Sequence, residues 1–388
     1  MLLHYIIWDC SPTALQLGGL SIKWYGVCMG LAFWGGRWIV AYVYTLTKRP
    51  LKEVDTFSIW ILLSALLGAR LGEVLFYHPH YYLTHPVEAL LPVRFFPQFR
   101  IVGYTGLSYH GALIGSALGA YGYLNYKLKC EFPPFRIKIV RTRRKRQSFL
   151  WLSTPLALAL MMGFLVRVGN FINAEIIGTP TKHRLGVLFA HEVKSVLKQT
   201  SPLITDVAIH KSPKEATTYQ DYVPITICIT LKNIGLPTQT IEDFIHQYIK
   251  PYLAYHKSIA KHIHEAPESL LNYTLTTQPQ GNPVIQITTK GIPRHPVQLY
   301  EGLGYLLALI IHLYWWQRKH HVLKDGVIAG SAMIVCYGLR FILEFFKDSF
   351  NVLLSGPVVT LTTGHLLSLL TVLSGVLLIR QSQRLNKQ

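Results

Sequence analysis

The chain has 388 residues, of which 50% are hydrophobic and 12% aromatic, and only 15% carry a formal charge. This composition excludes an ordinary soluble enzyme and is typical of a polytopic membrane protein. Lysine and arginine outnumber aspartate and glutamate by 38 to 19, but the basic residues are largely placed in short stretches between apolar runs. That distribution indicates membrane topology rather than nucleic-acid binding.

Seven apolar runs are long enough to cross a bilayer as helices. They cover residues 19–46, 54–77, 103–126, 149–167, 298–316, 326–346 and 358–379. A connection rich in proline and aromatic residues, 78–102, is expected to lie at the membrane interface as an arm, and a strongly basic loop, 127–148, follows the third run. The fold class predicted is therefore an all-α membrane protein with about seven transmembrane helices.

Segment 179–293 differs in kind from the rest of the chain. Apolar residues nearly alternate with polar ones in 223–231 and 284–289, which predicts strands, whereas 241–263 has helical spacing. We expect a small α+β head inserted between the fourth and fifth spans. The membrane domain then consists of residues 1–178 and 294–388.

Charge distribution predicts how the protein is oriented. With the N-terminus outside, seven spans place every basic cluster on one side, which the positive-inside rule makes cytoplasmic. The head is then extracytoplasmic and the C-terminus cytoplasmic. Because the first basic residue is Lys23, the N-terminus lacks the charged start of a cleavable signal peptide, and we expect its first apolar run to be retained.

A polar cluster follows the fourth apolar run. Arg167 ends an uncharged stretch that begins at Phe149, and Asn170, Asn173 and Glu175 follow within nine positions. On helical spacing Arg167 and Asn170 share a face, with Asn173 one turn further, so several donors can converge on one anionic group. The alternative is a helix leaving the membrane, in which the arginine extends to the interface and Gly178 ends the helix.

A second arginine, Arg340, lies with Glu344 inside another apolar segment. Each arginine at hydrophobic depth costs roughly 2.5 to 3.5 kcal/mol on insertion scales, so such residues are expected to be used or paired. The five cysteines show no CxxC and no metal-ligand spacing, and no Walker or GxGxxG loop occurs. The sequence therefore implies no metal and no nucleotide cofactor.

Four motifs together resemble the prolipoprotein diacylglyceryl transferase family. They are His-Gly-Ala-Leu-Ile-Gly from His110, Arg-Val-Gly-Asn-Phe-Ile-Asn-Ala-Glu from Arg167, Arg-His-Pro-Val-Gln-Leu-Tyr-Glu from Arg294, and Tyr-Gly-Leu-Arg-Phe-Ile-Leu-Glu-Phe-Phe from Tyr337. The resemblance implies a bacterial inner-membrane enzyme that transfers diacylglycerol from phosphatidylglycerol to the lipobox cysteine of a prolipoprotein. Its implied partners are phosphatidylglycerol, prolipoprotein signal peptides and the lipid bilayer, without a cofactor.

The implied reaction requires a site that holds developing negative charge. A thiol sulfur displaces glycerol phosphate from the glyceryl carbon, and arginine offers a permanent charge with a forked set of donors. We therefore assign the lipid phosphate to Arg167 and Arg340, with Asn170 and Asn173 as neutral donors. Gly178 ends the stretch that begins at Arg167 and is placed with the lipid-binding residues. Tyr25 either bonds the lipid head group or is an ordinary interfacial tyrosine.

The thiol must also lose a proton, since thiolate is the nucleophile. His110 is one base candidate. Its alternative is a buried histidine bonded to a neighbouring hydroxyl, among glycines that serve helix packing. Glu175 and Glu344 are rival bases, although each could instead orient an arginine. For the motif from Arg294 to Glu301 we expect a structural and gating role, with these two residues as a possible ion pair.

The sequence departs from the family pattern at three positions. Ala112 and Ala174 stand where the family usually has glycine, and His365 stands where glutamine is common. The basic loop and the head are also longer than expected. Two other classes of protein are less favoured: a lipid transporter predicts pseudo-symmetric halves with broken helices, which we do not find, and a membrane anchor for a partner-binding head gives the intramembrane arginines no purpose.

Overall fold

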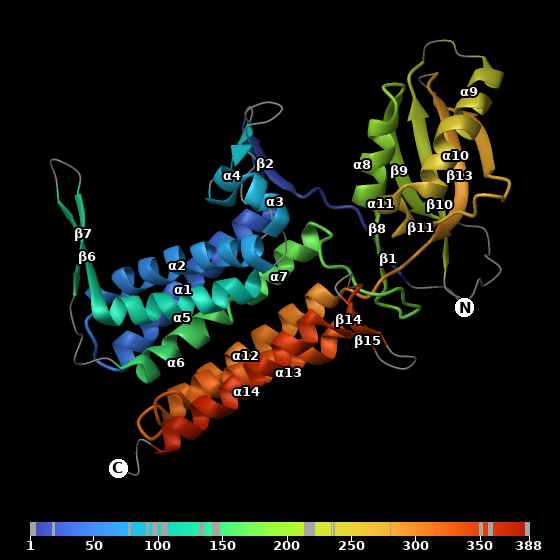
Figure 1. Ribbon diagram of the computed structural model, residues 1–388. Helices are drawn as coiled ribbons and strands as arrows, with labels where there is room; N and C mark the ends of the chain where they lie inside the picture. Colours follow the sequence, from blue (N-terminus) through green and yellow to red (C-terminus); the bar gives the residue numbers. More distant parts are fainter. Residues whose placement is uncertain are drawn as a thin grey trace. The chain divides into compact units, whose positions relative to one another are not determined.

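The computed structural model describes residues 5–17, 20–76, 79–90, 93–94, 100–101, 108–131, 136–141, 148–212, 222–233, 235, 237–279, 281–348, 352–355 and 360–384. This part of the chain is mostly helical with a small sheet region (Figure 1). It divides into two compact units. One unit comprises Met1–Met29, Leu165–Leu303 and Ile342–Val352, and the other comprises Gly30–Phe164, Gly304–Phe341 and Leu353–Gln388.

Six helical segments are long and apolar enough to span a membrane. They are α1 (Trp24–Leu46), α2 (Lys52–Phe76), the run Phe149–Ile172 that contains α6 (Phe149–Leu160) and α7 (Gly163–Ile172), α12 (Val297–Lys319), α13 (Val327–Glu344) and α14 (Thr363–Arg384). The predicted span 103–126 contains α5 (Tyr109–Asn125), whose 17 residues extend about 25 Å. Residues 102–107 lie outside the described chain, so the count of seven spans stays a prediction.

The long helices carry rows of exposed apolar side chains. On α12, Leu303, Leu307, Ile310 and Ile311 are each at least half exposed. Their spacing of three to four residues places them on one side of the helix. An apolar row of this length is unfavourable in water and suits contact with lipid acyl chains.

Helices α2 and α5 contact each other through glycines. A Cβ atom on Gly72 would lie 2.8 Å from Ser108 Cβ and 3.0 Å from Gly111 Cα, and one on Gly115 would lie 3.0 Å from Gly68 Cα. Only the absence of side chains lets two helix backbones approach this closely. The packing role considered for the glycines that follow His110 is therefore confirmed for Gly111 and Gly115.

The two connections predicted on either side of α5 contain secondary structure. The arm 78–102 includes α3 (Pro79–Thr84), α4 (Pro86–Leu90), β4 (Val93–Arg94) and β5 (Arg100–Ile101). Arg70 on α2 is buried, and its guanidinium donates to the carbonyls of Ala89, at 2.8 Å, and Glu88, which holds the arm to α2. The basic segment predicted as a loop contains an antiparallel hairpin of β6 (Tyr126–Glu131) and β7 (Arg136–Arg141).

The sheet region lies in the unit that contains α7. Its strands are β9 (Ile204–Lys211), β10 (Val223–Leu231), β11 (Ile263–His264), β12 (Asn272–Thr277) and β13 (Pro283–Gly291), in the order β11-β13-β10-β9 with β12 also paired to β13. β10 coincides with the predicted strand 223–231, and β13 contains 284–289. The sheet is antiparallel, with Ile227 opposite Ile287 and Ile209.

Helices cover one face of this sheet (Figure 1). They are α8 (Ala190–Thr200), α9 (Thr238–Phe244), a π-helical turn (Ile245–Ile249), α10 (Lys250–Tyr255) and α11 (Lys257–Ala260). Alternate residues of β10, including Ile225, Ile227 and Ile229, are fully buried beneath them. The alternation that predicted a strand is thus the pattern that gives the sheet one apolar face.

The short strand β1 (Ile6–Trp8) runs parallel to β8 (Val187–Phe189), which leads directly into α8. Trp8 packs on Phe171 of α7, with ring centroids 4.6 Å apart. The remaining strands are β2 (Thr13–Leu17), β3 (Leu20–Lys23), β14 (Val352–Ser355) and β15 (Thr360–Thr362). The chain start therefore contacts both the sheet region and the end of α7.

Candidate active site

Helix α7 directs its polar residues to a buried face. Arg167 and Asn170 are each 5% exposed, and Arg167 Nη1 donates to Asn170 Oδ1 at 3.4 Å. The shared face predicted from helical spacing is confirmed. Beyond the helix, Glu175 accepts hydrogen bonds from Asn170 Nδ2 at 2.9 Å and from Asn173 Nδ2 at 3.2 Å. The two asparagines therefore tie the carboxylate of Glu175 to the face that carries Arg167.

Arg167 belongs to a chain of four buried charges. Its Nε lies 2.7 Å from Glu301 Oε2, and the Nζ of Lys347 lies 3.0 Å from Glu301 Oε1 and 3.0 Å from Glu344 Oε2. All four side chains are less than a tenth exposed. Among these four side chains, positive and negative charges alternate from one contact to the next, an arrangement that makes burial of ions tolerable.

Sequence reasoning did not single out Lys347. The signal was present, because Lys347 follows Glu344 by only three residues, just beyond the end of α13. A lysine just beyond an apolar segment is more often an interfacial residue that extends to water. The buried ammonium group of Lys347 contacts Glu301, which is 46 residues away in the sequence.

The predicted pair of Arg294 with Glu301 is wrong. Arg294 Nη1 lies 2.9 Å from Asp348 Oδ2 and donates to the carbonyl of Gly178 at 2.9 Å, while Nε donates to the carbonyl of Lys261 at 2.6 Å. Arg294 thus joins the turn between α11 and β11 to the segments around residues 178 and 348. These contacts agree with the structural role expected for Arg294, although its partner is Asp348 and not Glu301. Its gating role stays a prediction.

The segment between α7 and β8 passes through an unusual backbone conformation. Ala174 and Ile176 both have φ of +55°, a left-handed conformation that residues with a Cβ rarely adopt. Gln298 Nε2 donates to the Glu175 carbonyl at 2.5 Å, which fixes this turn. Ala174, the departure from the family's usual glycine, therefore lies where glycine would be less strained.

Gly178 lies against the start of the fifth predicted span. Its N–H donates to the His295 carbonyl at 3.2 Å, and a Cβ added to it would lie 2.7 Å from His295 Cβ and from Val297 Cγ2. A glycine is needed here for close backbone contact. Its proposed part in lipid binding stays a prediction.

Three predicted site residues lie on other helices. Tyr25 is in the first turn of α1. A Cβ on Gly169 of α7 would lie 3.1 Å from Tyr25 Cα, so this turn packs closely against α7. His110 and Arg340 belong to the other unit, and both are half-buried. His110 lies in the first turn of α5, and Arg340 lies on α13 one turn before Glu344. Their chemical roles stay predictions.

A sequence profile described as prolipoprotein diacylglyceryl transferase matches residues 12–380. The chain belongs to this family.

Similar proteins that match almost its full length bear the name phosphatidylglycerol–prolipoprotein diacylglyceryl transferase. The one from Chloroherpeton thalassium is 26% identical over 97% of this chain and 94% of its own length. The one from Bacteroides fragilis is 30% identical over 90% of this chain and 85% of its own, and that from Tolumonas auensis is 23% identical over 98% of both. The protein is thus a transferase and, with its apolar helices, a multi-pass bacterial membrane protein.

The transferase carries His365 where glutamine is common in the family. His365 is buried near the start of α14, and its Nδ1 accepts the backbone N–H of Thr362 at 3.1 Å and lies 3.0 Å from the Thr362 hydroxyl. Thr362 directly precedes the helix and His365 is its third residue. The bond from the Thr362 N–H to the side chain three residues later is one half of a capping box, a bond that a glutamine side chain also accepts.

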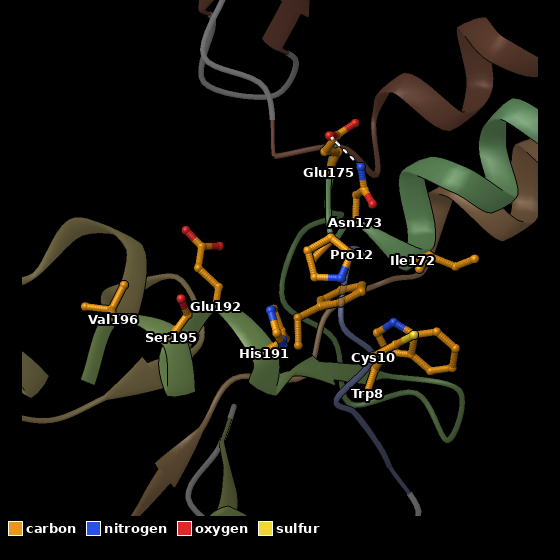
Figure 2. A pocket seen from close by; sticks show the side chains of 12 residues that line it. Trp8, Cys10, Pro12, Ile172, Asn173, Glu175, His191, Glu192, Ser195 and Val196 are labelled. Carbon is orange, nitrogen blue, oxygen red and sulfur yellow. Dashed lines mark hydrogen bonds between the residues drawn. The ribbon is translucent and has the colours of Figure 1, made fainter. Parts of the chain in front are cut away.

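A pocket of about 390 Å³ adjoins the end of α7 in the transferase (Figure 2). The N-terminal segment contributes Trp8, Cys10 and Pro12, α7 and the following turn contribute Ile172 to Glu175, and α8 with the preceding strand end contributes Phe189, His191, Glu192, Ser195 and Val196. Asn173 and Glu175 thus belong both to the pocket and to the network of Arg167. Sequence reasoning did not identify this pocket, because its walls come from three separate parts of the chain.

Proposed function

We propose that the protein transfers the diacylglyceryl group of phosphatidylglycerol to the thiol of a lipobox cysteine in prolipoproteins. A sulfur–carbon thioether bond forms, the bond between the glyceryl carbon and the phosphate oxygen breaks, and glycerol phosphate leaves with the electron pair. Membership of the family and the names of relatives that match nearly the whole chain support this reaction. The observation that carries it in the structure is the buried guanidinium of Arg167.

The surroundings of Arg167 suit a phosphate-binding role. The contact of Nε with Glu301 at 2.7 Å holds the plane of the guanidinium, whereas the Nη1 contact with Asn170 is long at 3.4 Å. A phosphate oxygen would accept a shorter, charge-assisted hydrogen bond from the same group. In the low dielectric of a buried site, such bonds stabilise the negative charge that develops on the leaving group.

The carboxylates of the network favour orienting roles. Glu344 is held by Lys347 at 3.0 Å, and both oxygens of Glu175 accept asparagine amides. Each carboxylate is therefore already engaged in the described structure as an acceptor. This supports His110 as the group that takes the thiol proton, with Arg340 as the second phosphate ligand.

A transfer assay tests the proposal. Detergent-purified protein would receive labelled phosphatidylglycerol and a peptide bearing a lipobox cysteine, with His110→Gln assayed beside the wild type. We expect thioether-linked diacylglycerol from the wild type and its loss in the variant. Lipid binding without any adduct would contradict the transferase assignment and favour a lipid transporter, and full activity of His110→Gln would exclude the histidine as base.

The orientation and domain division belong to the same proposal. We infer that the N-terminus and the head 179–293 are extracytoplasmic, that the C-terminus is cytoplasmic, and that residues 1–178 and 294–388 form the membrane domain. The position of the basic clusters supports this topology. Labelling of single cysteines placed in the head and at the C-terminus, in intact cells and in lysed cells, distinguishes it from the inverse.

A further inference from the structure

The pocket at the end of α7 contains two polar atoms that lack partners. Within the described part of the chain, Trp8 Nε1 and Asn173 Oδ1 are buried and have no hydrogen-bond partner. One is a donor and the other an acceptor. Buried polar groups in folded proteins are nearly always satisfied, so an unpaired donor and acceptor among the walls of one pocket indicate groups that a bound molecule satisfies.

Both residues are held in place by their surroundings. The Trp8 indole packs on Phe171, and Phe171 in turn lies 5.7 Å from Phe189. Asn173 is fixed through its Nδ2, which donates to Glu175 Oε1 at 3.2 Å and leaves Oδ1 as the unpaired atom (Figure 2). The donor and acceptor are therefore presented without a large loss of side-chain entropy.

The pocket is acidic. Its lining includes Glu175 and Glu192, and among the described lining residues there is no lysine or arginine. The His262 imidazole, fully buried with its Nε2 3.4 Å from Glu192, lowers the pKa of that carboxyl to about 2, and Ser258 and Lys261 act in the same direction. Glu192 is consequently charged at every physiological pH, and a phosphate group is repelled.

Helix α8 is fastened to the N-terminal segment on one side of this pocket. Lys194 Nζ lies 2.6 Å from Asp9 Oδ2, and His191 Nδ1 lies 3.9 Å from Asp9 Oδ1. The wall that carries Glu192 is thereby joined to the wall that carries Trp8. A volume of about 390 Å³ accommodates a short stretch of polypeptide rather than a single small ion.

We propose that this pocket binds the polypeptide substrate, holding one peptide group near the reacting cysteine between the Trp8 Nε1 donor and the Asn173 Oδ1 acceptor, while Glu192 disfavours acidic side chains. A peptide group offers one carbonyl acceptor and one N–H donor, which complements the two unpaired atoms. The inference rests on the proposed transfer reaction. It assigns Asn173 Oδ1 to the protein substrate, whereas Asn173 Nδ2 donates to Glu175 in the network of Arg167.

Trp8→Phe tests the donor, because it keeps an aromatic ring and removes the N–H. In steady-state transfer assays we expect the KM for the lipobox peptide to rise about five- to tenfold, as for the loss of one hydrogen bond of about 1 kcal/mol, with kcat and the KM for phosphatidylglycerol unchanged. Trp34→Phe, at an exposed tryptophan of α1, is the matched control and should leave all three constants unchanged.

Two substrate series test the acceptor and the charge. Replacing single amides after the cysteine by esters removes one N–H at a time, and one position should raise the KM of the wild type several-fold. A peptide with aspartate there should be transferred about tenfold less efficiently than its asparagine counterpart, and Glu192→Gln should reduce this difference to less than threefold. This second variant keeps the test valid if Trp8→Phe folds poorly.

The outcomes distinguish a failure of the pocket assignment from a failure of the proposed reaction. Absence of adduct with every peptide would contradict the proposed function and, with it, the pocket assignment. Normal transfer with unchanged peptide KM in both Trp8→Phe and Glu192→Gln would overturn the pocket assignment alone. A rise in the KM for phosphatidylglycerol, with that for the peptide unchanged, would assign the pocket to the lipid head group and equally refute the peptide site.

Discussion

Lys347→Met should destabilise the transferase strongly, because it removes one ion from the buried network and preserves most of the volume. Lys347 is 3.0 Å from both Glu301 and Glu344, and its side chain is 5% exposed. Without it, the carboxylates of Glu301 and Glu344 lose the positive charge that contacts both of them. Breaking a buried ion pair in this way costs about 3 to 5 kcal/mol.

A second substitution tests whether the loss of stability comes from the loss of charge. Lys347→Met combined with Glu344→Gln leaves the net charge of the network unchanged, since one positive and one negative charge that contact each other are removed together. We expect the double variant to recover most of the lost free energy of unfolding. The coupling between the two substitutions should be at least about 2 kcal/mol, within the range measured for residues in direct contact.

Titration with a denaturing detergent measures the free energy of unfolding for each variant. Arg37→Met is the surface control: it breaks an ion pair of 2.6 Å with Asp55 whose side chains are 39% and 60% exposed, and should cost no more than about 1 kcal/mol. A Lys347→Met protein as stable as this control would refute the reasoning. So would a double variant whose loss equals the sum of the two single losses.

Other predictions concern the site and its departures from the family. Arg340→Ala should abolish transfer in a protein that still inserts, and near-normal turnover would remove it from the phosphate site. Arg167→Lys should lose at least tenfold in kcat/KM, because a point charge replaces a fork; full activity would indicate that charge alone suffices. Ala174→Gly should raise the free energy of unfolding by about 1 kcal/mol by relieving the left-handed φ, and an unchanged or lower stability would contradict the strain. His365→Gln should keep the stability of the wild type while His365→Leu loses about 1 kcal/mol, a difference that thermal unfolding detects and that equal stability would exclude.

Local periodicity predicted the parts of the site that one helix or strand contains. The shared face of Arg167 and Asn170 follows from helical spacing, and the strand 223–231 follows from alternation. Nearness in the sequence did not predict the partner of Arg294. Arg294 precedes Pro296 and the helix that begins at Val297, so it is not on the helix that carries Glu301.

Local sequence patterns do not predict contacts between segments that are distant in the chain. Asp348 meets Arg294 across 54 residues, and Trp8 meets the end of α7 through a parallel strand pair with β8. No local sequence property encodes either contact. The hairpin in the basic segment is a different case, because apolar and basic residues alternate within β6 and β7, and this signal was available in the sequence.

The glycine contact between α2 and α5 bears on how a lipid reaches any site in this enzyme. Since even a methyl group on Gly72 or Gly115 would meet the neighbouring helix, the seam between these helices admits no acyl chain. A diacyl substrate arriving sideways from the bilayer must therefore enter through some other gap. Cross-linking α2 to α5 should consequently leave lipid access undisturbed, which makes this helix pair a fixed reference against which movements of the other helices can be followed.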